Sequence, residues 1–270
     1  MWDDRSVVHD EGPPFVLVPG AWLGGWAWRA VGRELRAAGH DVYPVTLTGL
    51  GDRAHLARPE VDLETHIEDV VSVLDAEDLR DAVLVGHSYA GIVTGGVADR
   101  RPDRLSAAVW LDSAPIPDGV AIVDALTPEQ RELYEREIRK RGDGWRIPVV
   151  DRQRLASGML GSAAGLDDAQ LDMIEQRGTA QPYATFTCPL RLTDGGPPTY
   201  RRAVIICTAG GMTADILREA IEQGDPRAAT LAGPGWEFYE FATGHWSMFS
   251  APVELANLLH TIATQSPTET

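Results

Sequence analysis

The chain has 270 residues, 44% hydrophobic and 24% charged, which is typical of one soluble globular domain that can carry an insertion. Its net charge of −16 argues against nucleic acid and anionic membrane surfaces as partners, because both require a basic patch. No apolar run reaches the ~20 residues that span a bilayer. The acidic start, Met1–Arg5, does not resemble a signal peptide.

The two cysteines, Cys188 and Cys207, lack the spacing of metal ligands. Cys207 ends an apolar run, so we expect at least this thiol to be buried and reduced. Together these features predict a cytoplasmic protein.

Apolar runs alternate with amphipathic segments along most of the chain. Residues 1–13 are expected to be a loose arm. The predicted strands are 15–18, 42–45, 82–85, 107–111, 203–207 and 237–241. The predicted helices are 26–38, the segment after Asp62 through Leu74, 91–98, 213–223 and 252–263. Because the strands are continuously apolar, they indicate a parallel sheet covered on both faces, an α/β fold.

Residues 114–199 break this alternation, since they contain a charged helix (Thr127–Arg141) but no convincing buried strand. We therefore divide the chain into a first core part (1–113), an inserted cap (114–199) and a second core part (200–270). The insertion leaves the sheet where ligands bind in open α/β folds, which favours a cap. An insertion away from the chemistry is the alternative.

The sequence Gly86-His87-Ser88-Tyr89-Ala90 lies between a buried strand and a helix of small residues. This context is typical of the nucleophile elbow of an α/β hydrolase, in which a strained turn exposes the serine hydroxyl above the sheet. We expect Ser88 to be the nucleophile. The alternative is a plain Gly-Ser loop.

A serine nucleophile needs a base and an oxyanion hole. His245 follows the last strand and comes after Ser88, the chain order of an α/β hydrolase, and is the expected base. His87 is expected to pack, and the other histidines to be exposed or satisfied. The backbone amides of Tyr89 and Ala21 are the expected oxyanion donors.

The orienting acid is left open. It usually follows the penultimate core strand, but no carboxylate occurs there before Asp215, which belongs to the next helix. Asp112 ends the strand after the elbow helix, in an apolar stretch where an unpaired carboxylate would be costly, and is the favoured candidate. The alternatives are Asp215 and a Ser-His pair without a carboxylate.

Four stretches resemble the branch of the α/β hydrolases that contains plant methylesterases, hydroxynitrile lyases and bacterial soluble esterases. They are FVLVPGAW (15–22), LTGLGDR (47–53), GHSYAG (86–91) and GHWSM (244–248). The resemblance covers nearly the whole core and is weakest in residues 114–199. It implies a Ser-His-Asp esterase without cofactor or metal.

This chain departs from the family at three places. It has Pro19-Gly20 where the family has His-Gly, and Gly210 where the family has its acid. The lyase members carry a threonine in the oxyanion loop and a lysine after the histidine, where this chain has Gly20 and Trp246. Gly20 and Trp246 argue against cyanohydrin chemistry, and Gly210 leaves the identity of the acid open.

The leading hypothesis is a serine hydrolase that cleaves a carboxylic ester or lactone of a small, largely apolar molecule. The expected substrate contacts are Trp22, Trp246 and Met248. The alternatives are a cofactor-free lyase or cyclase that uses the same Ser/His site, and a non-catalytic binding protein. The expected partner is the small-molecule substrate, without nucleic acid or membrane, and a homodimer is compatible with the sequence.

Overall fold

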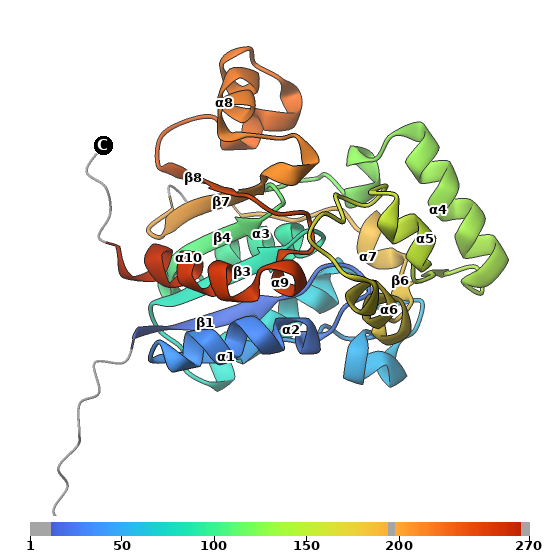
Figure 1. Cartoon of the computed structure of the whole chain (residues 1–270), viewed down its shortest axis with the longest axis horizontal. Coiled ribbons are helices and arrows are strands. Elements are labelled where there is room, and N and C mark those ends of the chain that lie inside the picture. Colours follow the sequence, from blue (N-terminus) through green and yellow to red (C-terminus); the bar gives the residue numbers. More distant parts are fainter. Residues whose placement is uncertain (1–11, 194–197, 266–270) are drawn as a thin grey trace, which may run out of the picture.

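A six-stranded parallel sheet forms the centre of the protein, in the order β2-β1-β3-β4-β7-β8 (Figure 1). The computed structural model describes residues 12–193 and 198–265. The strands of this sheet are β1 (Gly12–Val18), β2 (His40–Pro44), β3 (Ala82–His87), β4 (Leu105–Leu111), β7 (Arg201–Cys207) and β8 (Trp236–Phe241). The expected α/β-hydrolase fold is confirmed in its central sheet.

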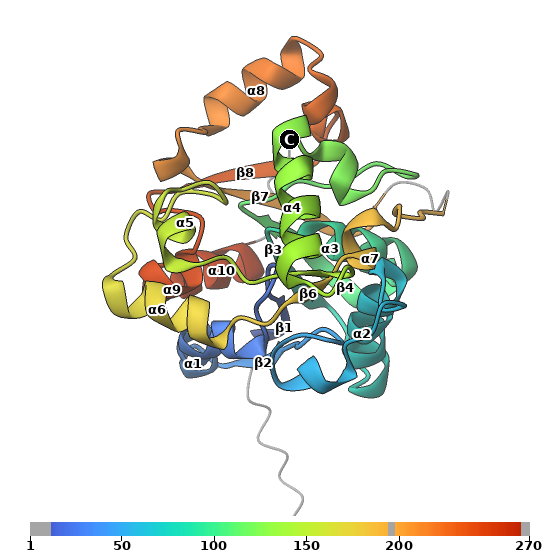
Figure 2. The same cartoon turned by 90° about the vertical axis from the view of Figure 1, so that its right-hand side faces the viewer.

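Helices cover both faces of the sheet (Figure 2). α1 packs with α10 on one face and α2 with α3 on the other, while α8 lies beside the edge strand β8. The helices of the core are α1 (Arg29–Ala37), α2 (Leu63–Ala76), α3 (Ala90–Arg100), α8 (Ala214–Glu222), α9 (Ser247–Ser250) and α10 (Pro252–Thr264). Short 3-10 helices are η1 (Gly25–Trp28), η2 (Gly51–Leu56), η3 (Pro102–Arg104), η5 (Thr208–Gly210) and η6 (Pro226–Leu231). No helix of the described ranges is long and apolar enough to cross a membrane.

The prediction of a loose arm over residues 1–13 is wrong at its end. Gly12 already pairs with His40, and the register of β1 shifts between Gly12 and Phe15. Pro13 and Pro14 occupy this shift, and because proline has no amide proton their presence concealed the start of the strand. Residues 1–11 lie outside the described part of the chain.

Between β4 and β7 the chain leaves the sheet, and we call residues 114–199 the insert. Its described residues lie at the carboxyl ends of the strands, on the right of Figure 1 and facing the viewer in Figure 2. Its elements are η4 (Ile122–Ala125), α4 (Pro128–Arg141), β5 (Arg146–Ile147), α5 (Arg152–Ala156), α6 (Asp168–Arg177), β6 (Gln181–Pro182) and α7 (Ala184–Thr187).

The charged helix expected in the insert is present as α4. Thr127 caps it, since its hydroxyl accepts from the Gln130 amide at 3.2 Å while Gln130 Oε1 accepts from the Thr127 amide at 2.9 Å. The sequence did not indicate β5 and β6, which form a small antiparallel sheet. Two residues per strand are too few to produce a hydrophobic pattern.

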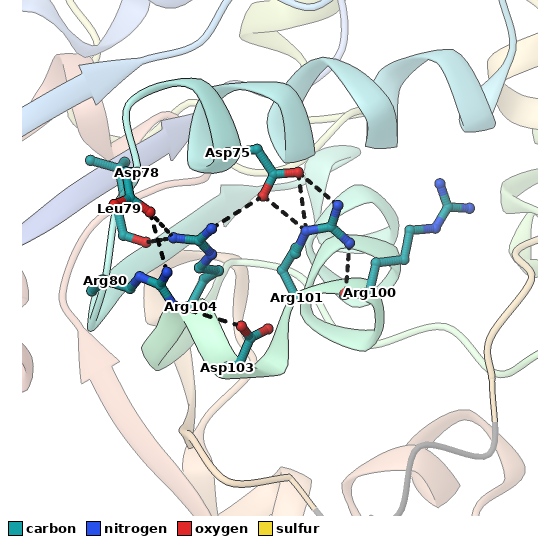
Figure 3. A network of polar contacts seen from close by, with 8 residues as sticks. All are labelled: Asp75, Asp78, Leu79, Arg80, Arg100, Arg101, Asp103 and Arg104. Atoms are coloured by element: carbon teal, nitrogen blue, oxygen red, sulfur yellow. Dashed lines mark hydrogen bonds and ion pairs between the residues drawn. The ribbon is translucent and has the colours of Figure 1, made fainter.

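At the opposite end of the sheet, arginines and aspartates join the ends of α2 and α3 (Figure 3). Arg101 binds Asp75 through two nitrogens, at 2.9 and 2.6 Å, and Arg104 contacts Asp78 at 2.5 Å. These groups are partly exposed, so the cluster adds little stability per ion pair.

Candidate active site

Ser88 lies on the sharp turn between β3 and α3. Its φ of +53° falls in the left-handed region, which non-glycine residues rarely adopt. The turn is held by the Ser88 amide, which donates to the Leu111 carbonyl at 3.1 Å, and by the Ser113 hydroxyl, which donates to the Ser88 carbonyl at 2.7 Å. A Cβ at Gly86 would lie 2.6 Å from the Ala90 carbonyl oxygen, so the strand and the helix approach too closely for a side chain there.

Asp112 and His245 form a hydrogen bond of 2.6 Å between Oδ2 and Nδ1. The contact expected from the sequence is therefore present. The other carboxylate oxygen of Asp112 accepts from the Cys207 amide at 3.1 Å, which fixes the group from the neighbouring strand. Because a carboxylate accepts the Nδ1 proton, the lone pair of the neutral imidazole is on Nε2.

Asp215, the alternative acid, does not take part in this arrangement. Its side chain is 93% exposed and pairs with Arg218 on the same helix, α8. The thiol of Cys207 is buried, as we expected from the sequence. Its burial and the nearby charge of Asp112 raise its pKa.

Ser88 and His245 line the same cavity, of about 340 Å³, between the core and the insert. Trp22, Tyr89 and Trp246 also line it. Met248 does not: it is 1% exposed within α9, one turn beyond the loop that carries His245, so its predicted contact with substrate is wrong. The insert contributes residues that the sequence did not single out, namely Ile122, Leu126, Gln130, Tyr134, Met159, Leu160, Gly161 and Phe186.

The loop after β1 brings Ala21 to the cavity. Its next residue, Trp22, has a φ of +65°, and its amide donates to Gln181 Oε1 of the insert at 3.1 Å. Over the described ranges, the amides of Ala21 and Tyr89 donate to no protein oxygen. Both are therefore free to bind an oxygen atom of a ligand.

His66 holds the side chain of Tyr89 in place through a hydrogen bond to its hydroxyl. Its Nε2 donates to the Thr48 carbonyl at 2.9 Å, so its Nδ1 accepts from the Tyr89 hydroxyl at 2.8 Å. Burial lowers the pKa of His66 to about 4, so the ring stays neutral. The sequence predicted an exposed or satisfied histidine here. The link to Tyr89 has no sequence signal, because His66 is on α2 and Tyr89 is on the turn before α3.

An aromatic stack connects Tyr89 to the insert. Its ring lies parallel to that of Phe186, with centroids 5.3 Å apart, and Tyr134 meets Phe186 edge-on at 5.9 Å. Burial raises the pKa of Tyr134 to about 12, so its hydroxyl remains a donor. Three aromatic rings therefore form this wall of the cavity.

His87 is buried, as the sequence expected for a packing residue. Its Nε2 donates to the His245 carbonyl at 2.9 Å, and the two rings lie 4.6 Å apart. Burial, together with the nearby His245, lowers the pKa of His87 well below its usual value, so it adds no positive charge beside the site. Within the described residues, no group of three or more His, Cys, Asp or Glu could hold a metal ion.

The fold and this site define a hydrolase of the α/β class. The alpha/beta hydrolase family model matches residues 15–258, and the chain belongs to this family. A carbendazim hydrolyzing esterase of a Nocardioides strain is 37% identical over 91% of this chain and 97% of its own length. Methylesterase 9 of Arabidopsis thaliana is 28% identical over 94% of this chain and 99% of its own.

Among solved structures, an extracellular alpha/beta-hydrolase from a Paenibacillus species has a TM-score of 0.76 at 21% identity, covering 94% of this chain and 100% of that one. Its identity is low enough that this likeness supports the fold alone. The sequence relatives place the chain in the branch of the plant methylesterases and bacterial esterases, a class of carboxylic ester hydrolases.

Proposed function

We propose that this protein hydrolyses a carboxylic ester or lactone of a small, largely apolar molecule, with Ser88 as nucleophile, His245 as base and Asp112 as orienting acid. The observation that carries the proposal is the 2.6 Å contact of Asp112 with Nδ1 of His245, beside a cavity that Ser88 also lines. A carboxylate in this position holds the imidazole in one tautomer and stabilises the imidazolium formed during attack.

In the first half of the reaction, Nε2 of His245 takes the Ser88 proton as Oγ bonds to the ester carbonyl carbon. The amides of Ala21 and Tyr89 donate to the oxyanion of the tetrahedral intermediate. The intermediate collapses with cleavage of the ester C–O bond, and the leaving alcohol takes the proton from His245. An acyl group remains on Ser88.

In the second half, His245 takes a proton from water as the water oxygen bonds to the acyl carbon. The second intermediate collapses, the proton returns to Ser88, and the carboxylic acid leaves. Ester and water have then become acid and alcohol, without redox change or cofactor.

We assign the insert the role of a cap, because eight of the fifteen residues that line the cavity belong to it. The aromatic wall of Tyr89, Phe186 and Tyr134 favours an apolar, aromatic group in the substrate. Carbendazim, for which the Nocardioides relative is named, belongs in the panel of test substrates. Both cysteines are free thiols, which supports the cytoplasmic location that we also propose.

A histidine base without a carboxylate partner would favour the lyase or cyclase alternative. His245 has a carboxylate partner, so no observation now favours that alternative over hydrolysis.

The test is covalent labelling with a serine-directed organophosphonate, followed by intact mass measurement, together with turnover of chromogenic short-chain esters. We expect one label per chain and ester turnover in the wild type, and neither in Ser88→Ala. Turnover near the wild-type rate in Ser88→Ala would refute the assignment of the nucleophile.

A further inference from the structure

The backbone of His245 is held from two sides by different parts of the fold. Its carbonyl accepts from His87 of the core at 2.9 Å, whereas its amide donates to the Ser162 carbonyl of the insert at 2.7 Å. The preceding amide, that of Gly244, donates to the Ala164 carbonyl at 3.2 Å. The loop that carries His245 is therefore paired with the insert through two consecutive backbone hydrogen bonds.

Gly161, which directly precedes Ser162 in the insert, lies against the His245 side chain. A Cβ added at Gly161 would lie 2.5 Å from the Cβ of His245 and 2.9 Å from its Cδ2. Real Cβ atoms essentially never approach other atoms within 3.0 Å, so a side chain at position 161 must displace either the histidine or the insert. The absence of a side chain at Gly161 is what allows the ring to occupy its present position.

Gly244, on the loop that carries His245, lies equally close to the insert. A Cβ there would lie 2.7 Å from the carbonyl oxygen of Ala164. Gly244 does not have a positive φ, so the position requires glycine for space and not for backbone conformation. Glycines thus occur on both sides of one close backbone contact, a pattern without role in the reaction steps described above.

We infer that residues 161–164 of the insert, and Gly161 in particular, are positioning residues for His245. The insert then completes the geometry of the base in addition to covering the cavity. This inference rests on the proposed function, in which His245 moves the protons of both half-reactions. Displacement of a reacting group by about 1 Å can cost ~10²-fold in rate, so disturbance of this contact lowers kcat. KM changes little, because the other walls of the cavity are untouched.

The first test compares Gly161→Ala with Gly158→Ala. Both glycines are in the same loop and both have positive φ, +101° and +74°, so both substitutions introduce backbone strain. A Cβ at Gly158 has its nearest neighbour at 3.8 Å, the carbonyl oxygen of Gly161, and does not meet His245. We expect kcat to fall ~10²-fold in Gly161→Ala and to stay close to the wild-type value in Gly158→Ala.

A second pair avoids backbone strain altogether. Gly244→Ala introduces the clash with Ala164, while Gly210→Ala places a Cβ 4.0 Å from its nearest neighbour, Ser162 Cβ, and neither glycine has a positive φ. We expect kcat to fall in Gly244→Ala only. If Gly161→Ala does not fold, as judged by its thermal unfolding, this second pair decides the question.

Proton NMR of the His245 imidazole measures the position of this ring independently of enzyme activity. The Nδ1 proton of His245, bound to Asp112, should give a downfield signal that His245→Ala lacks. We expect the signal in the wild type, Gly158→Ala and Gly210→Ala, and its shift or loss in Gly161→Ala and Gly244→Ala. The proposed function fails if His245→Ala keeps wild-type turnover. The present inference fails, separately, if folded Gly161→Ala and Gly244→Ala keep both the signal and kcat, or if each loses no more than its control.

Discussion

Asp112 stands at the end of β4, whereas the family's acid usually follows the next strand of the sheet, β7. In this chain Gly210 occupies the position of that acid. β4 and β7 are neighbours in the sheet, with Leu111 beside Ile205, so a carboxylate at the end of either strand can reach the loop after β8. The Cys207 amide at the end of β7 donates to Asp112, so the strand that lacks the acid still helps to position it.

Both Ser88 and Asp112 have left-handed backbones, with φ of +53° and +44°. Such conformations cost about 1–3 kcal/mol each and persist only where surrounding contacts impose them. Here the Ser88 amide donates to Leu111 at 3.1 Å and the Asp112 amide to Ile205 at 2.7 Å, so the sheet itself holds both turns.

Replacement of Asp112 by asparagine removes the charge that faces His245 and allows the wrong tautomer. We predict that Asp112→Asn lowers kcat by ~10³- to 10⁴-fold, the scale of the same change in a serine protease. The control is Asp215→Asn, which alters an exposed carboxylate and should change kcat less than about tenfold. Equal rates for the two variants with a chromogenic ester would contradict the role of Asp112.

The catalytic residues of the core could be predicted because each of them follows a strand that the local sequence reveals. Ser88 and Asp112 each follow a strand with a clear apolar pattern, and His245 follows the last strand, so topology alone brings the three to one edge. Met248 was misplaced, because the sequence does not show that a short helix begins at Ser247 and turns its side chain into the core.

At the scale of elements, prediction succeeded for the long helices, including α4 of the insert, and failed for the short elements of the insert. α2 illustrates the success: an apolar stripe behind Asp62 predicted a capped helix, and the Asp62 carboxylate accepts from the Thr65 amide at 3.0 Å. The insert illustrates the failure, since its two-residue strands and short helices depend on packing against the core. The contact of residues 161–164 with His245 joins positions about 80 residues apart, and no local pattern indicates it.

The N-terminal capping bond of α2 is relevant to the site, because this helix carries His66, which hydrogen-bonds to the Tyr89 hydroxyl. We predict that Asp62→Ala lowers the free energy of unfolding by about 1 kcal/mol, since one helical amide loses its acceptor. Asp62→Asn keeps an acceptor and should remain close to the wild type. Urea unfolding at neutral pH measures both, and equal losses in the two variants would mean that the capping bond is not the source of the effect.

At the scale of the whole molecule, stability should depend on pH through buried histidines, and His66 supplies one defined part of this dependence. Its pKa is about 4 in the folded protein and 6.5 when unfolded, so the unfolded chain takes up a proton first as the pH falls. The stabilising contribution is complete above pH 6.5 and is lost between pH 6.5 and 4. The loss should be on the order of 3 kcal/mol.

Urea midpoints across this pH range measure the effect. We expect His66→Gln to be less stable at neutral pH but to show a smaller decrease toward pH 4. His55, an exposed histidine, provides the control, because His55→Gln should keep the full wild-type slope. An unchanged slope in His66→Gln would show that other groups cause the pH dependence.

The central claim is that Ser88 and His245 act as one unit, and the kcat values of the two single variants and their double variant test it most directly. In a unit of this kind each single loss removes nearly all of the shared contribution, so losses do not multiply. We predict that Ser88→Ala and His245→Ala each lower ester turnover by several orders of magnitude and that the double variant is scarcely slower than either. Losses that multiply in the double variant would show that the two residues act independently and would contradict the account.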